Sequence, residues 1–165
     1  MKLRVRPRLF LALAALTAVI AGGTIVGTGL VSGLSGESEA TRLRGKALYD
    51  LHCASCHGAQ LEGQPNWTSP LPNGRLPAPP HDASGHTWHH ADNVLIGITL
   101  HGLAPYAGEG YESDMPAFAD TLTHQDAADI LAYIRSTWPE RERAHQKRVT
   151  EQYRASQSGS APEPK

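Results

Sequence analysis

The stretch Cys53-Ala54-Ser55-Cys56-His57 decides how the rest of this 165-residue chain is interpreted, and it contains the only two cysteines. The pattern C-x-x-C-H is the attachment motif for c-type haem. Each thiol can add across a vinyl group of the macrocycle, and the adjoining imidazole can then bind the iron. We therefore predict one covalent haem c, with thioether bonds to Cys53 and Cys56 and with His57 as the proximal iron ligand.

The motif has two other interpretations. A zinc site that includes His52 is one, but zinc fingers usually draw their second pair of ligands from a distant segment. A redox C-x-x-C pair is the other, and it needs a βαβ context that is not visible in this sequence. Haem attachment is the interpretation that the remaining features support.

A second axial ligand is expected from Met115, in the sequence Ser-Asp-Met-Pro-Ala-Phe at residues 113–118. A thioether is a soft, neutral ligand, and His/Met ligation raises the reduction potential of the iron. Pro116 stiffens the loop that must hold the sulfur against the metal. The alternatives are that Met115 only fills a gap in the core, or that another histidine takes the position.

The N-terminal residues predict export and a membrane anchor. Four cationic side chains in residues 1–8 precede an uncharged stretch at 9–31, which as a helix would span about 35 Å. Basic residues before a span place that end in the cytoplasm. We expect a single-pass protein of the bacterial inner membrane, with a cytoplasmic segment 1–8, an anchor at 9–31 and the haem domain in the periplasm. A cleaved signal peptide is the alternative.

The remaining chain divides into three parts. Residues 32–39 are a linker rich in serine, glycine and glutamate, 40–138 are the haem domain, and 139–165 are a charged extension. Apolar spacing predicts an all-α domain without a sheet. Its expected helices run from about Ala40 to His52, from Thr87 to Leu100 and from Asp126 to Thr137, the last behind a Thr123/Asp126 capping box. Loops are expected at Gly58–Asp82 and Ala104–Pro116. A solvated helix to Arg154 and a disordered tail should follow.

Charge bears on the choice of partner. Between Ala40 and Trp138 there are five basic and ten acidic residues, although the whole chain carries a net charge of only −1. An acidic domain argues against nucleic-acid binding. It favours a redox protein with a basic docking face, because electrostatic steering speeds encounter.

These motifs together resemble class I cytochrome c over about residues 40–138. Gly45 and Tyr49 match the glycine and aromatic residue of the first helix of that family, and Ile130 and Tyr133 match the pair on its last helix. The chain is also similar to small anchored bacterial monohaem cytochromes. The resemblance implies three main helices and loops wrapped round one covalent haem, and electron transfer rather than an enzymatic reaction.

The resemblance also implies a hydrogen-bond partner for the proximal histidine. In the family, a proline carbonyl after the haem motif accepts from the ligating imidazole, which orients the ring. Pro77, Pro79 and Pro80 are candidates, and we expect Pro79. Candidate hydrogen-bond donors to the haem propionates are Trp67, Arg75, Tyr106 and Tyr111.

Four histidines lie between positions 81 and 90: His81, His86, His89 and His90. At helical spacing, His86 with His90, or His86 with His89, is a candidate Cu(II) or Zn(II) site, and a solvated helix start is the alternative. Three functional classes therefore remain: a tethered electron shuttle, a cytochrome subunit of a membrane oxidase, reductase or dehydrogenase with the charged tail as its docking element, and a histidine-rich metal-handling protein. The shuttle is our leading prediction.

Overall fold

The computed structural model describes residues 37–108 and 110–159. The predicted segments 1–8 and 9–31, and most of the linker, lie outside the described residues. Within the described ranges every regular element is helical, and no helix is long and apolar enough to cross a membrane. The elements are α1 (Glu39–His52), α2 (Ala54–His57), the 3-10 helix η1 (Thr87–His89), α3 (Asp92–His101), α4 (Ala104–Ala107), α5 (His124–Ser136) and α6 (Glu140–Ser158). The all-helical prediction is confirmed for these residues.

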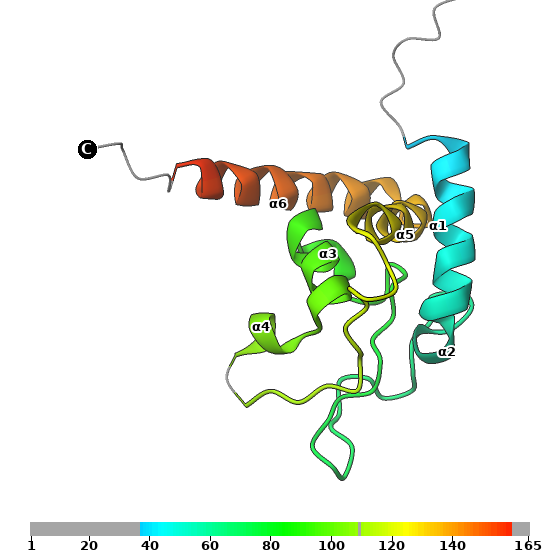
Figure 1. Cartoon of the computed structure of the whole chain (residues 1–165), viewed down its shortest axis with the longest axis vertical. Coiled ribbons are helices and arrows are strands. Elements are labelled where there is room, and N and C mark those ends of the chain that lie inside the picture. Colours follow the sequence, from blue (N-terminus) through cyan, green and yellow to red (C-terminus); the bar gives the residue numbers. More distant parts are fainter. Residues whose placement is uncertain (1–36, 109, 160–165) are drawn as a thin grey trace, which may run out of the picture. The chain divides into compact units, whose positions relative to one another are not determined.

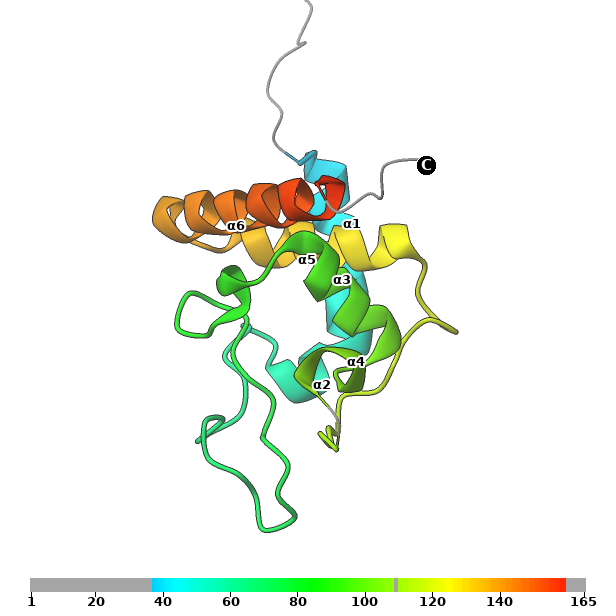
Figure 2. The ribbon, with the colours of Figure 1, turned by 90° about the vertical axis from the view of Figure 1, so that its left-hand side faces the viewer.

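The frame of the domain is the crossing of α1 over α5. Figures 1 and 2 show the two helices at a steep angle, with α5 seen nearly end-on in the first view. Gly45 lies at the point of contact: a Cβ atom there would be 1.9 Å from the carbonyl oxygen of Asp129. Only glycine permits backbones to approach so closely. This crossing sets the direction in which α1 ends at the haem motif.

The buried face of α1 is narrower than its apolar spacing suggests. Gly45 and Tyr49 are its buried residues, whereas Leu43 and Leu51 are 59% and 74% exposed. Tyr49 packs against Tyr133 at 5.5 Å between ring centroids. The face of α1 that carries Gly45 and Tyr49 is covered, Leu48 is partly buried against the core, and Leu43 and Leu51 remain exposed.

Helix α5 begins as its sequence predicts. Thr123 and Asp126 form a reciprocal capping box, in which each side chain accepts from the backbone N–H of the other residue. The Asp126 carboxylate also pairs with Arg44 of α1, and so does Asp129. The hydrogen bonds from Thr123, followed by the charge of Arg44, lower the pKa of the Asp126 carboxyl. The cap and the ion pairs thus hold the two crossing helices together.

The expected helix from Thr87 to Leu100 is divided in the structure. Residues Thr87–His89 form η1, His90 and Ala91 are extended, and α3 starts at Asp92. The first N–H of α3, at Asp92, has no intrahelical partner and donates instead to the hydroxyl of Thr150 on α6 at 3.1 Å. The expected loop at Ala104–Pro116 also differs, since its first four residues form the short helix α4 (Ala104–Ala107).

Helix α6 is longer and less solvated than its charged sequence suggests. It continues to Ser158, past the predicted end at Arg154, and it buries Gln146 and Thr150. The Gln146 amide donates to the carbonyl of His90 at 3.3 Å and to the carboxylate of Asp92 at 2.5 Å. Figure 1 shows α6 lying across the start of α3. The predicted helix is present and mostly exposed, but the face that carries Gln146 and Thr150 is packed against the domain.

Replacing Gln146 by alanine should destabilise the domain, because the carbonyl of His90 and the carboxylate of Asp92 lose a buried donor. We expect a loss of about 1–3 kcal/mol in the free energy of unfolding, measured by urea denaturation followed by circular dichroism. Gln152, exposed on the same helix, provides the matched control and should tolerate alanine. Equal effects at the two positions would show that α6 does not depend on this contact.

Candidate functional site

The two cysteines lie on a single helical turn that follows α1 directly. Cys53 ends α1, its N–H donating to the carbonyl of Tyr49 at 2.8 Å, and it also precedes α2. Neither cysteine is in a disulfide; Cys53 is partly buried against the core and Cys56 is exposed. Burial raises the pKa of the Cys53 thiol to about 11. Both sulfurs are therefore unoxidised thiols on one short segment, as thioether attachment requires.

The chain reverses immediately after His57. Gly58 has a φ of +83°, and a Cβ atom there would lie 2.1 Å from the carboxylate of Glu62. The hydroxyl of Tyr49 donates to the carbonyl of Gly58 at 2.8 Å. Because Tyr49 is itself buried at the helix crossing, the α1–α5 frame holds the turn that aims His57.

The His57 ring is oriented by a single hydrogen bond. Its Nδ1 lies 2.8 Å from the carbonyl oxygen of Pro79. A carbonyl can only accept, so Nδ1 carries the proton and Nε2 keeps its lone pair. Burial lowers the pKa of His57, and the bond to Pro79 opposes that effect. The neutral imidazole with a free Nε2 is the form that binds a metal ion.

The proline-rich loop is built to bring the Pro79 carbonyl to this position. Gly63 donates to the carbonyl of His57 at 2.8 Å, and Gln64 donates to the carbonyl of Ala78 at 2.8 Å. A Cβ atom on Gly63 would lie 2.5 Å from the nitrogen of Pro80. The segments around Gly63 and around Ala78 thus lie side by side next to His57. Of the three prolines considered from the sequence, the structure selects Pro79.

His81 lies next to His57, although its place in the sequence groups it with the histidines of residues 81–90. Its ring stacks on His57, with centroids 4.0 Å apart and planes 22° apart. Its Nδ1 lies 2.8 Å from the hydroxyl of Thr87, and its carbonyl accepts from the indole of Trp138 at 2.7 Å. Burial and the nearby His57 lower the pKa of His81 well below its usual value. The positions of His57 and His81 in the sequence do not predict that their rings stack.

The other histidines of the 81–90 stretch are engaged in ring packing. His86 stacks on Trp67 at 5.3 Å, and His89 stacks on Trp88 at 3.6 Å. His145 of α6 closes the second group, at 5.3 Å from each ring. Among the described residues no group of three or more His, Cys, Asp or Glu side chains is arranged to hold a metal ion. These ring contacts pack η1 against the proline-rich loop and against α6.

Met115 is partly buried in the loop between α4 and α5. Its N–H donates to the hydroxyl of Ser113 at 3.1 Å. Just beyond it, Phe118 and Ala119 donate to the last carbonyls of α3, at Thr99 and Leu100, at 3.1 and 3.0 Å. The downstream end of the loop is therefore anchored to α3.

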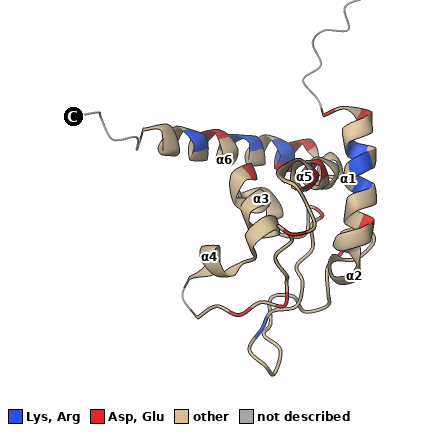
Figure 3. Ribbon diagram, viewed as in Figure 1, with Lys and Arg blue, Asp and Glu red and all other residues tan. Residues whose placement is uncertain are grey.

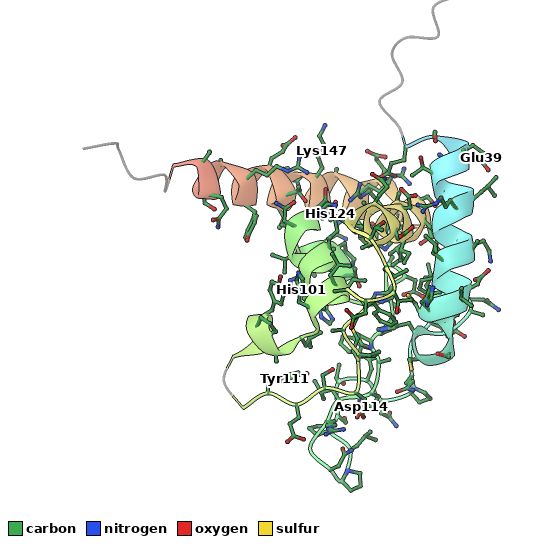
Figure 4. All side chains as sticks on the ribbon, viewed as in Figure 1. Glu39, His101, Tyr111, Asp114, His124 and Lys147 are labelled. Carbon is green, nitrogen blue, oxygen red and sulfur yellow. The ribbon has the colours of Figure 1, made fainter. Side chains whose placement is uncertain are left out.

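The candidate propionate donors have other neighbours in the described structure. Arg75 pairs with Glu112 and Asp114. The hydroxyl of Tyr106 approaches α3 so closely that a Cβ atom on Gly97 would lie 1.8 Å from it. Trp67 packs on His86. Figure 4 shows Tyr111 and Asp114 along the same loop, away from the α1–α5 crossing.

The donor set fits a covalent haem. Two unoxidised thiols and an imidazole with a free Nε2 lie on five consecutive residues, and the ring orientation is held by a carbonyl. An iron porphyrin attached through two thioethers needs these groups in this order. The residues present and the group therefore agree.

Comparison with known proteins gives the same result. The family model for cytochrome c matches residues 43–138, more than half of the chain. Cytochrome c-554(547) of Halothiobacillus neapolitanus is 33% identical over 94 residues, which cover 54% of this chain and 89% of that protein. No solved structure gave a significant match. Members of the family carry covalently bound haem and transfer electrons, and this chain belongs to the cytochrome c family.

Proposed function

We propose that this protein is a monohaem c-type cytochrome that carries single electrons between respiratory partners while tethered to the periplasmic face of the inner membrane. The observation that carries the proposal is the hydrogen bond of His57 to Pro79, beside two unoxidised thiols. When bound, the haem supplies an Fe(III)/Fe(II) couple. A single C-x-x-C-H supports one haem per chain.

Each residue of the site has a defined task in this proposal. Cys53 and Cys56 would hold the macrocycle by thioether bonds, which would prevent its dissociation. His57 offers Nε2 to the iron, and the Pro79 carbonyl keeps the ring from rotating and raises its basicity. Met115 would supply a neutral sulfur as the second ligand, which would favour the reduced state.

Changing both Cys53 and Cys56 to alanine should abolish covalent haem, because no thioether can form. The wild-type chain should retain its colour after extraction with acidified organic solvent, and the double variant should lose it. Ser55→Ala, within the same turn, is the matched control and should retain the haem. A wild-type chain that releases its haem on extraction contradicts the assignment.

Met115→Ala should lower the midpoint potential and open one side of the iron to small ligands. The expected signs are loss of the weak far-red sulfur-to-iron absorption band and binding of carbon monoxide by the ferrous protein at neutral pH. His101→Ala, at the end of α3, tests a competing ligand and should leave both properties unchanged. If Met115→Ala behaves as the wild type, Met115 is not the ligand.

The distribution of charge supports a basic partner at the haem-motif end. Figure 3 shows basic positions concentrated on α1 and α6, while the loops carry mostly acidic residues. Arg75 is the one Lys or Arg residue in the described loops at Gly58–Asp82 and 110–118. It is already paired with two carboxylates. The exposed acidic side chains near the motif include Asp50 and Glu62. Attraction to such a surface should weaken with ionic strength.

The membrane tether rests on the cationic segment 1–8 and the uncharged stretch 9–31. A domain held close to the bilayer meets membrane partners at an effective concentration up to the millimolar range. Weak contacts that exchange rapidly then suffice. The competing function is a docked subunit of a membrane enzyme, and the exposed Lys147 and Arg148 of α6 are the side chains through which a packed α6 would dock.

Replacing residues 1–31 by a cleavable signal should leave the spectrum and potential unchanged but slow electron flow in membranes. The assay is respiratory flux at matched abundance of the cytochrome. Charge reversal at Lys147 and Arg148 is the companion variant and should have little effect. If it stops flux while loss of the tether does not, the chain is a docked subunit. A mature N-terminus near Gly33 in the native protein would refute the tether.

A further inference from the structure

The two loops that carry Pro79 and Met115 are joined by one side chain. Arg75 of the proline-rich loop donates from Nη2 and Nε to the Glu112 carboxylate at 3.0 and 3.2 Å, and from Nη1 to the carboxylate of Asp114. A planar guanidinium can hold two carboxylates at once, which an ammonium group does less well. The next residue after Asp114 is Met115.

Arg75 is held on a well-formed turn. Leu71 donates to the carbonyl of Arg75 at 2.9 Å, and Gly74 donates to the carbonyl of Leu71 at 2.8 Å. The N–H of Arg75 is bound by the side-chain oxygen of Asn73 at 3.0 Å. Because its backbone is restrained, the guanidinium is a firm point of attachment for the opposite loop.

Upstream of Met115, the described residues of the opposite loop make few hydrogen bonds to the rest of the domain. Within the described residues, the hydrogen bonds of Tyr111 and Met115 stay inside the loop, to Gly108 and Ser113. The hydrogen bonds that join 111–116 to another described part of the chain are those of Arg75. Downstream, Phe118 and Ala119 are bound to α3. Met115 therefore lies between a firm anchor and the Arg75 ion pairs.

We propose that Arg75 is a positioning residue that clamps the Met115 loop and so keeps the methionine sulfur on the iron. The inference rests on the proposed function, in which Met115 is the axial ligand. A loop free at its upstream end has more conformations in which the sulfur is withdrawn, and an external ligand then competes better for the metal. The Arg75 side chain is 35% exposed and those of Glu112 and Asp114 are 70% and 57% exposed, so water weakens the effect without removing it.

The test is imidazole binding to the ferric holoprotein, followed by loss of the far-red sulfur-to-iron band. Arg75→Gln should raise the affinity for imidazole by about three- to tenfold, and Asp114→Asn by a smaller factor. Arg75→Lys should fall between wild type and Arg75→Gln. Lys147→Gln removes an exposed cation on α6 and is the matched control, with wild-type affinity expected.

The double variant identifies the mechanism. If Arg75 acts through Asp114, the effects of Arg75→Gln and Asp114→Asn are not additive. Additive effects, or a shift in potential from Arg75→Gln with no change in imidazole affinity, would show that Arg75 acts on another group, such as a propionate, and would overturn the clamp. Unchanged affinity in Arg75→Gln, with the band present in the wild type, would overturn the clamp alone. A wild-type protein without the band would overturn both the clamp and the Met115 assignment.

Discussion

The hydrogen bond from His57 to the Pro79 carbonyl, 2.8 Å long, is the interaction on which the rest of the site depends. It joins the helical half of the domain, which delivers the C-x-x-C-H motif, to the long loop that faces it. Without it the imidazole could rotate and present either nitrogen. With it, one tautomer and one orientation are selected before any metal is bound.

The helices supply the rigidity that this bond requires. Gly45 brings α1 onto α5, and Tyr49, one turn later, is buried at the crossing and donates to the carbonyl of Gly58. The position of His57 is thus set from both sides, by a helix crossing and by a loop. The loop that carries Met115 is held in a similar way, by Arg75 at one end and by the carbonyls at the end of α3 at the other. A domain of this size buries little apolar surface unaided, and covalent haem adds a large apolar body to that core.

The sequence predicted the features that depend on interactions between neighbouring residues. The C-x-x-C-H motif, the capping box at Thr123 and the proline-rich loop are all local, and each is present where its residues indicate. The choice of Pro79 over its neighbours came from the resemblance and agrees with the structure. Leu43 and Leu51 are exposed although they are apolar, because the nearness of α5 at Gly45 decides which face of α1 is covered. Contacts between distant segments, such as His81 on His57, Thr150 on Asp92 and Arg75 on Asp114, leave no periodicity to find. Charge alone was a poor guide to α6, whose buried residues are two uncharged polar side chains.

The central claim is that one iron is held between His57 and Met115 in a domain organised around covalent haem. X-ray absorption at the iron edge of the purified native protein measures the first coordination shell directly. We expect one sulfur and five nitrogen scatterers, with the sulfur absent in Met115→Ala. A first shell of nitrogen or oxygen alone in the wild type would contradict it.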